Sequence, residues 1–271
     1  MCGHCHDGAP QGGKDVGQDR AKDRAKDMAK DGIDRRSLMA LGVAAAATAA
    51  GVTRVLAPSP AAAAHSKPTS LSADDALSAL KDGNGRYVSQ PQECVVGLAE
   101  ARARVAGAQS PWATIISCAD SRVPPELVFG GLGLGELFVA RNAGNLVDTA
   151  TMGTVEYGAA VLGSPLIVVM GHSHCGAVSA ACDVVTENAT YPGSIGPMID
   201  PIVPAALAVR DAPGDFLDNA VRESAKRTAA RLAATSFVLA DLPKAGKLKI
   251  VAAHYELVSG AVTFMEPTSS Y

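Results

Sequence analysis

The chain has 271 residues, a formal net charge of −3 and only 4% aromatic residues. This composition argues against a nucleic-acid-binding protein, which needs a basic surface and aromatic side chains that stack on bases. Six cysteines in a chain of this length do not indicate a small disulfide scaffold. Residues 65–271 are numerous enough to bury a sizeable core in one domain.

The first 64 residues predict an export leader. Asp34-Arg-Arg-Ser-Leu-Met39 resembles the twin-arginine signal, and an Ala- and Gly-rich stretch over 38–55 follows it. The small residues of a cleavage site come next, at 61–64. We expect residues 1–64 to be a cytoplasmic extension and signal peptide, and 65–271 the mature domain. Twin-arginine export machinery would then deliver the protein to the periplasm or the cell exterior. An uncleaved membrane anchor and a cytoplasmic Ala-rich extension are the alternatives.

After the leader, short β-branched strands alternate with amphipathic helices. The first helix is expected to take Ser72 as its N-cap and to end at Gly83, and a second helix over 97–106 completes an N-terminal helical arm. The alternation predicts an α/β fold with a mostly parallel central β-sheet flanked by helices. Ser259-Gly260 suits a two-residue hairpin turn that adds an antiparallel edge strand. The expected strands cover residues 113–117, 137–140, 166–170 and 248–254, and the longer helices 152–162 and 216–240.

Metal-ligating side chains follow two of these strands. Cys118 comes just after the run 113–116, and His172 and Cys175 follow the run 166–170. Open α/β sheets place their sites at the carboxyl ends of strands. The His-x-x-Cys spacing suits one helical turn, whose N-terminal field would favour a thiolate at Cys175. Two thiols and one imidazole suit tetrahedral Zn²⁺, with the fourth position left for water. The sequence therefore predicts one catalytic Zn²⁺ per chain.

A carboxylate–guanidinium pair lies in the same run of sequence as the first cysteine. Asp120 and Arg122 belong to Cys118-x-Asp-x-Arg. We expect Asp120 to accept a hydrogen bond from the attacking hydroxide, and Arg122 to hold that carboxylate through a bidentate contact. Released from Arg122, the carboxylate would be free to take the fourth zinc position. A plain structural ion pair is the alternative.

Four stretches of this chain together resemble the β-class carbonic anhydrases, over roughly residues 70–265. They are Cys118-Ala-Asp-Ser-Arg-Val-Pro-Pro-Glu126, Gly135-Glu-Leu-Phe-Val-Ala-Arg-Asn-Ala-Gly-Asn145, Gly153-Thr-Val-Glu-Tyr157 and Gly171-His-Ser-His-Cys-Gly176. The resemblance implies that the family's zinc ligands fall on Cys118, His172 and Cys175, its catalytic dyad on Asp120 and Arg122, and its carbon dioxide pocket on Gln109, Phe138, Ala143 and Tyr157.

The same resemblance implies a function and an assembly. The activity would be the reversible hydration of carbon dioxide to bicarbonate and a proton by a zinc-bound hydroxide. The protein would be a homodimer or a higher homo-oligomer, with the helices over 72–106 reaching over a partner. One alternative is a carbonyl sulfide or carbon disulfide hydrolase on the same zinc site. Another is a non-enzymatic zinc-binding or redox-sensing protein, against which Asp120, Arg122 and the open fourth ligand position argue.

Overall fold

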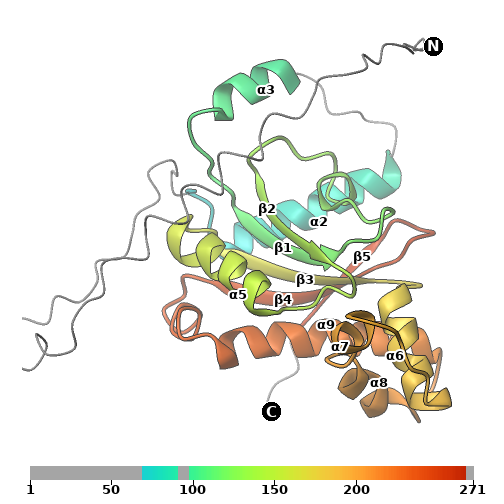
Figure 1. Ribbon diagram of the computed structural model, residues 1–271. Helices are drawn as coiled ribbons and strands as arrows, with labels where there is room; N and C mark the ends of the chain where they lie inside the picture. The colour runs from blue at the N-terminus through green and yellow to red at the C-terminus, as the bar shows by residue number, and fades with distance from the viewer. Residues whose placement is uncertain (1–68, 91–97, 267–271) are drawn as a thin grey trace, which may run out of the picture. The chain divides into compact units, whose positions relative to one another are not determined.

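The structure is a computed structural model that describes residues 69–90 and 98–266 (Figure 1). The predicted leader, with its arginine pair and cleavage site, lies outside these residues. Among the helices of the described ranges, none is long and apolar enough to cross a membrane.

Five strands form one sheet in the order β2-β1-β3-β4-β5. The first four are mutually parallel, and β5 pairs antiparallel with β4 at the edge. Every residue of β1 and β3 is buried, as expected of parallel strands covered on both faces. The predicted α/β fold with its antiparallel edge is therefore confirmed. The strands are β1 Ala113–Cys118, β2 Leu137–Asn142, β3 Leu166–His172, β4 Lys249–Tyr255 and β5 Val262–Met265.

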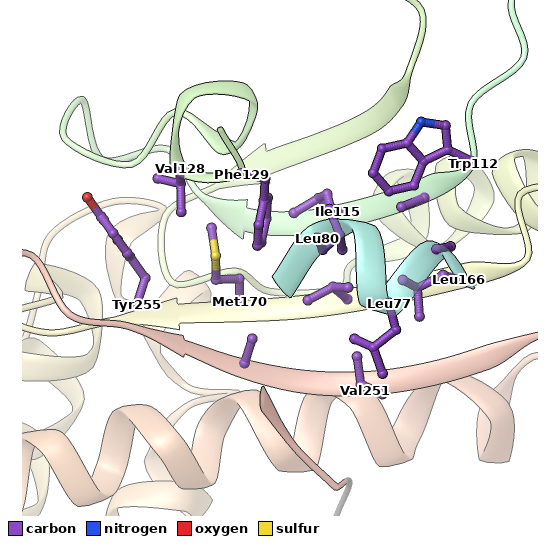
Figure 2. Close-up of a cluster of buried hydrophobic side chains, with 14 of the residues drawn as sticks. Leu77, Leu80, Trp112, Ile115, Val128, Phe129, Leu166, Met170, Val251 and Tyr255 are labelled. Atoms are coloured by element: carbon purple, nitrogen blue, oxygen red, sulfur yellow. The ribbon is translucent and has the colours of Figure 1, made fainter. Parts of the chain in front are cut away.

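Helices cover both faces of this sheet. Successive residues of a strand point to opposite faces, so Ile115 packs on one side and Ile116 on the other. Figure 2 shows the first side, where Leu77 and Leu80 of α2 pack near Ile115 and Met170. The helical elements are α2 Ala73–Ser89, α3 Leu98–Val105, α4 Pro125–Val128, α5 Thr149–Glu156, the π-helical η2 Tyr157–Val161, α6 Gly176–Glu187, α7 Ile195–Ile199, α8 Val203–Val209 and α9 Phe216–Thr235.

The start of α2 is confirmed and its predicted end is wrong. The Ser72 hydroxyl accepts a hydrogen bond from the Asp75 N–H at 3.1 Å, as an N-cap does. The helix continues through Gly83 to Ser89. A Cβ at Gly83 would lie 2.1 Å from the carbonyl oxygen of Phe129. This glycine therefore permits a close approach of two backbones and does not terminate the helix.

The predicted two-residue hairpin turn is also wrong. Tyr255 pairs with Val262, so residues 256–261 connect the two strands. The side chain of Asn84 on α2 holds this wider turn, because its Nδ2 donates to the Gly260 carbonyl at 2.8 Å and its Oδ1 accepts from the Val262 N–H at 2.8 Å. A contact from 176 residues away therefore shapes a turn that local sequence alone suggested would be tighter.

The two glycines of α2 give a test of its packing. Gly83→Ala is expected to destabilise the protein by about 1–3 kcal/mol, because the new Cβ overlaps the Phe129 carbonyl. Gly85 is exposed, with nothing within 4 Å of an added Cβ. Gly85→Ala is therefore expected to stabilise by about 0.5–1 kcal/mol through helix propensity. Urea unfolding measures both changes, and a Gly83→Ala protein at least as stable as wild type would contradict the close approach.

Candidate metal centre

The carboxyl ends of β1 and β3 lie side by side. The connections that leave these two strands run to opposite faces of the sheet. The segment after β1 contributes α4 to one face of the sheet, and the segment after β3 contributes α9 to the other. Open α/β sheets bind their ligands at such a divergence, beyond the carboxyl ends of the strands. Cys118 is the last residue of β1 and His172 the last residue of β3.

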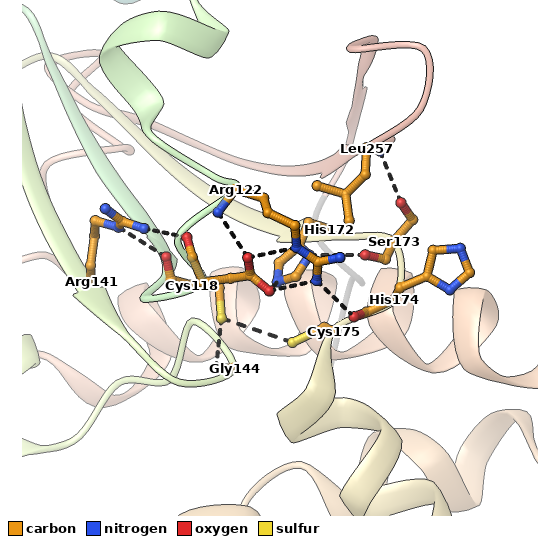
Figure 3. A network of polar contacts seen from close by, with 10 residues as sticks. Cys118, Arg122, Arg141, Gly144, His172, Ser173, His174, Cys175 and Leu257 are labelled. Atoms are coloured by element: carbon orange, nitrogen blue, oxygen red, sulfur yellow. Dashed lines mark hydrogen bonds and ion pairs between the residues drawn. The ribbon is translucent and has the colours of Figure 1, made fainter.

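Three side chains converge beyond the ends of these two strands (Figure 3). One donor atom from each of Cys118, His172 and Cys175 lies within 4.8 Å of the other two. All three residues are buried, and the two sulfur atoms are 4.0 Å apart. Two sulfurs bound at about 2.3 Å to one tetrahedral zinc lie about 3.8 Å apart. The donor set and its spacing therefore fit a metal ion.

The hydrogen bonding of His172 supports the same fit. Its Nδ1 lies 2.9 Å from the Ser173 carbonyl oxygen, so Nδ1 carries the proton and Nε2 presents a lone pair. Nε2 is buried and has no hydrogen-bond partner among the described residues. A buried polar atom without a partner costs about 1–3 kcal/mol. Coordination of a metal by Nε2 removes that cost.

The two thiols are electrostatically linked. A hydrogen bond from Cys175 lowers the pKa of Cys118 to about 4, and the Gly144 N–H, 3.4 Å from that sulfur, adds to the effect. The same interaction with Cys118, together with burial, raises the pKa of Cys175. The pair therefore favours a thiolate on one of the two sulfurs, which is the form that binds a metal.

The link between His172 and Cys175 differs from the sequence prediction. His172 ends a strand, whereas Cys175 is the N-cap of α6, so the two ligands do not share one helical turn. His174 between them adopts a left-handed conformation with φ of 55° and turns the chain sharply. The N–H groups at the start of α6 do lower the pKa of Cys175, but the interaction with Cys118 outweighs them.

The ion pair between Asp120 and Arg122 has the expected bidentate geometry. Asp120 accepts from Arg122 Nε at 2.9 Å and from Nη2 at 2.7 Å, and the Arg122 N–H adds a third bond at 2.9 Å. These contacts hold the pKa of Asp120 well below its usual range. Asp120 Oδ2 lies 3.8 Å from His172 Nε2. An ionised, fixed carboxylate therefore borders the metal-ligand cluster.

Sequence reasoning assigned no role to two further residues that contact Cys118. Arg141 on β2 donates to the carbonyls of Cys118 at 2.9 Å and Asp120 at 2.6 Å. Gly144 supplies the N–H close to the Cys118 sulfur, and its φ of 78° suits glycine. Their position at and just after the carboxyl end of β2, the strand beside β1, was the available signal.

The four predicted pocket residues separate into two groups. Ala143 directly precedes Gly144, next to the cluster. Phe138 pairs with Thr114, four residues before the level of Cys118, or about 13 Å along the strand. Its ring lies 6.1 Å from that of Tyr157. Gln109 precedes the amino end of β1. Within one chain, Gln109, Phe138 and Tyr157 therefore lie away from Cys118.

Comparisons with known proteins point to one family. The sequence model of the carbonic anhydrase family matches residues 113–262. A solved Coccomyxa β-carbonic anhydrase in complex with acetazolamide is 26% identical, has a TM-score of 0.53, and aligns over 69% of this chain and 85% of its own. The chain belongs to the β-class carbonic anhydrase family.

Other carbonic anhydrases show the extent of the similarity. The carbonic anhydrase of Mycolicibacterium smegmatis is 39% identical over 188 residues, which are 69% of this chain and 90% of the relative. The structure of one of two tetrameric β-carbonic anhydrases from Sordaria macrospora shares the fold at 23% identity and a TM-score of 0.53, covering 70% of this chain and 94% of its own. This β-carbonic anhydrase is therefore an enzyme that interconverts carbon dioxide and bicarbonate.

Removal of one ligand tests the metal centre. Cys175→Ala is expected to lose its bound metal, because only two of the three donors remain. Cys182→Ala is the matched control: this thiol lies in the same apolar cluster, and burial raises its pKa to about 11. Elemental analysis of the purified variants measures metal per chain. Full metal retention in Cys175→Ala would remove that residue from the ligand set.

Proposed function

We propose that Cys118, His172 and Cys175 hold one Zn²⁺ per chain and that this centre carries out the reversible hydration of carbon dioxide. One observation carries the proposal: the buried Nε2 of His172 lies beside two linked thiols and has no hydrogen-bond partner within the described part of the chain. Imidazole and thiolate ligands suit zinc, and three protein ligands leave one position open. When bound, zinc lowers the pKa of a coordinated water to about 7, for which carbonic anhydrase is itself the standard example.

The residues around the ligands orient the reactants. Asp120 can only accept hydrogen bonds while ionised, so it selects a water whose proton points toward it and whose lone pair points away. Arg122 keeps Asp120 ionised through the bidentate contact. Arg122 Nη2 also lies 3.5 Å from the His174 carbonyl. It therefore links the loop after β1 to the turn after β3 that joins His172 to Cys175, which we call the ligand turn.

Removal of the arginine tests this role. Arg122→Ala is expected to keep its zinc and to lose carbon dioxide hydration by about 10–100-fold, because Asp120 loses its charge partner and its anchor. Asp120→Ala is expected to be impaired as well. Lys249→Ala is the control, since it removes an ion pair with Asp74 at the opposite end of the sheet. Zinc content and stopped-flow hydration rates measure the two effects. A wild-type hydration rate in zinc-loaded Arg122→Ala would refute the proposed role of Arg122 and Asp120.

We further propose that the working enzyme is at least a homodimer, in which a second copy supplies Gln109, Phe138 and Tyr157 to each metal centre. Four observations support this. Within one chain these residues lie away from Cys118. Tyr157 is 41% exposed, although it pairs with another aromatic ring. The strand that carries Phe138 forms an edge of the sheet. The mostly exposed α3 is suited to reach over the partner.

The assembly has a hydrodynamic and a functional test. Sedimentation at micromolar concentration is expected to give the mass of a dimer or larger oligomer, and a monomer would count against the proposal. Cys175→Ala and Tyr157→Ala chains, each impaired alone, are expected to regain activity when co-assembled. The mixed dimer restores one site with an intact metal centre and an intact pocket. Absence of recovery would place Tyr157 outside the partner's site.

We also propose that residues 1–64 are a cytoplasmic extension and a signal peptide, and that twin-arginine export machinery delivers the mature domain, 65–271, outside the cytoplasmic membrane. The motif Asp34-Arg-Arg-Ser-Leu-Met39 and the small residues at 61–64 support the proposal. This route exports folded proteins, which suits an enzyme that acquires its metal before transport.

Conservative replacement of the arginine pair tests export. A chain with both Arg35→Lys and Arg36→Lys keeps its charge but is expected to remain in the cytoplasm, because the twin-arginine route reads arginine specifically. Cell fractionation with an antibody to the mature domain measures the location. A single change of Lys26→Arg, outside the motif, is the control. Unchanged export of the double variant would indicate a different route.

A further inference from the structure

Ser173 lies between two metal ligands and is anchored to the turn between β4 and β5. It is 8% exposed, and its N–H donates to the Tyr255 carbonyl at 2.9 Å. Its hydroxyl oxygen accepts from the Leu257 N–H at 2.9 Å and donates to Glu256 Oε1 at 3.3 Å. Figure 3 shows the bond that joins Ser173 to Leu257. Three hydrogen bonds therefore attach one residue of the ligand turn to a separate part of the fold.

The carbonyl of the same residue sets the orientation of the histidine ligand. His172 Nδ1 donates to the Ser173 oxygen at 2.9 Å. A metal-bound histidine usually donates its second ring proton to a carboxylate or carbonyl, which fixes the tautomer and the ring plane. Here the acceptor belongs to the very next residue. The ring of His172 is therefore held only as firmly as the Ser173 peptide is held.

The β4–β5 turn, to which Ser173 is hydrogen-bonded, is itself held in place. The Glu256 carboxylate accepts from the N–H groups of Ser259 and Val258, which lower its pKa to about 2. Asn84 of α2 bonds the same turn at the Gly260 carbonyl. Glu256 therefore stays ionised at neutral pH and is a fixed acceptor for the Ser173 hydroxyl.

We propose that Ser173 is a positioning residue of the metal centre, which holds the His172 ring in its ligating orientation by attaching the ligand turn to the β4–β5 turn. The inference rests on the zinc centre proposed above. It extends the centre from its three ligands to a hydrogen-bonded path that runs from Glu256 and Leu257 through Ser173 to His172.

Metal affinity is the decisive measurement. Ser173→Ala removes both hydroxyl bonds and leaves the His172–carbonyl bond dependent on a less restrained peptide. Its affinity for Zn²⁺, measured by competition with a chromogenic chelator on the full chain, is expected to fall by about 10–100-fold. Glu256→Ala leaves Ser173 intact but removes its acceptor, and a smaller loss in the same direction is expected. Ser173→Thr retains the hydroxyl and is expected to recover most of the affinity.

A matched control separates positioning from stability. Ser164 is a buried serine just before the other end of β3, and its hydroxyl donates to the Leu166 carbonyl at 3.3 Å. Ser164→Ala is expected to lower the melting temperature of the metal-free protein while leaving zinc affinity unchanged. The cobalt-substituted protein adds a second readout, because a displaced histidine ligand alters its visible absorption spectrum.

The outcomes are distinguishable. Zinc affinity of Ser173→Ala within twofold of wild type, with only a stability loss like that of Ser164→Ala, would overturn the inference and leave the metal centre intact. If Ser173→Ala does not fold, unchanged zinc affinity in Glu256→Ala overturns the inference in its place. A wild-type chain that binds no zinc would overturn the proposed centre, and this inference with it.

Discussion

The parallel pairing of β1 with β3 is the constraint on which the rest of the molecule depends. Cys118 and His172 are far apart in sequence and meet only because these two strands are neighbours in a definite register. A slip of one residue would send every side chain of a strand to the opposite face of the sheet. The buried β-branched residues of both strands prevent that slip, since it would break the packing on each face. The hydrophobic core therefore determines where the metal ligands lie.

Polar contacts from neighbouring elements then restrain the cluster on several sides. Arg141 of β2 holds the carbonyls around Cys118, and Arg122 links the loop after β1 to the turn that contains His174. Ser173 connects that turn to the carboxyl end of β4. A centre built this way keeps two thiols and an imidazole close together before any cation arrives. Such preorganisation avoids ordering the ligands at the moment of binding.

Two expectations failed where a distant contact overruled a local preference. Gly83 looks like a helix terminator, yet α2 continues through it, and the Phe129 backbone packs where a side chain would be. Ser259-Gly260 suits a tight hairpin, yet Asn84 holds a wider turn. The N-cap at Ser72 was predicted correctly, because a cap depends on atoms only three residues apart. Local features were thus readable from the sequence, and features that depend on approach between elements were not.

The sequence by itself determined the fold class, the strand-end placement of Cys118 and His172, and the pairing of Asp120 with Arg122. Each depends on periodicity or on short spacing, which a chain displays directly. Only the tertiary structure decided which side chains support the ligands, because Arg141 and Ser173 act across strands that lie far apart in the chain. It also decided that Phe138 and Tyr157 lie away from the cluster of their own chain. The strand register sets that separation, and residue spacing does not reveal it.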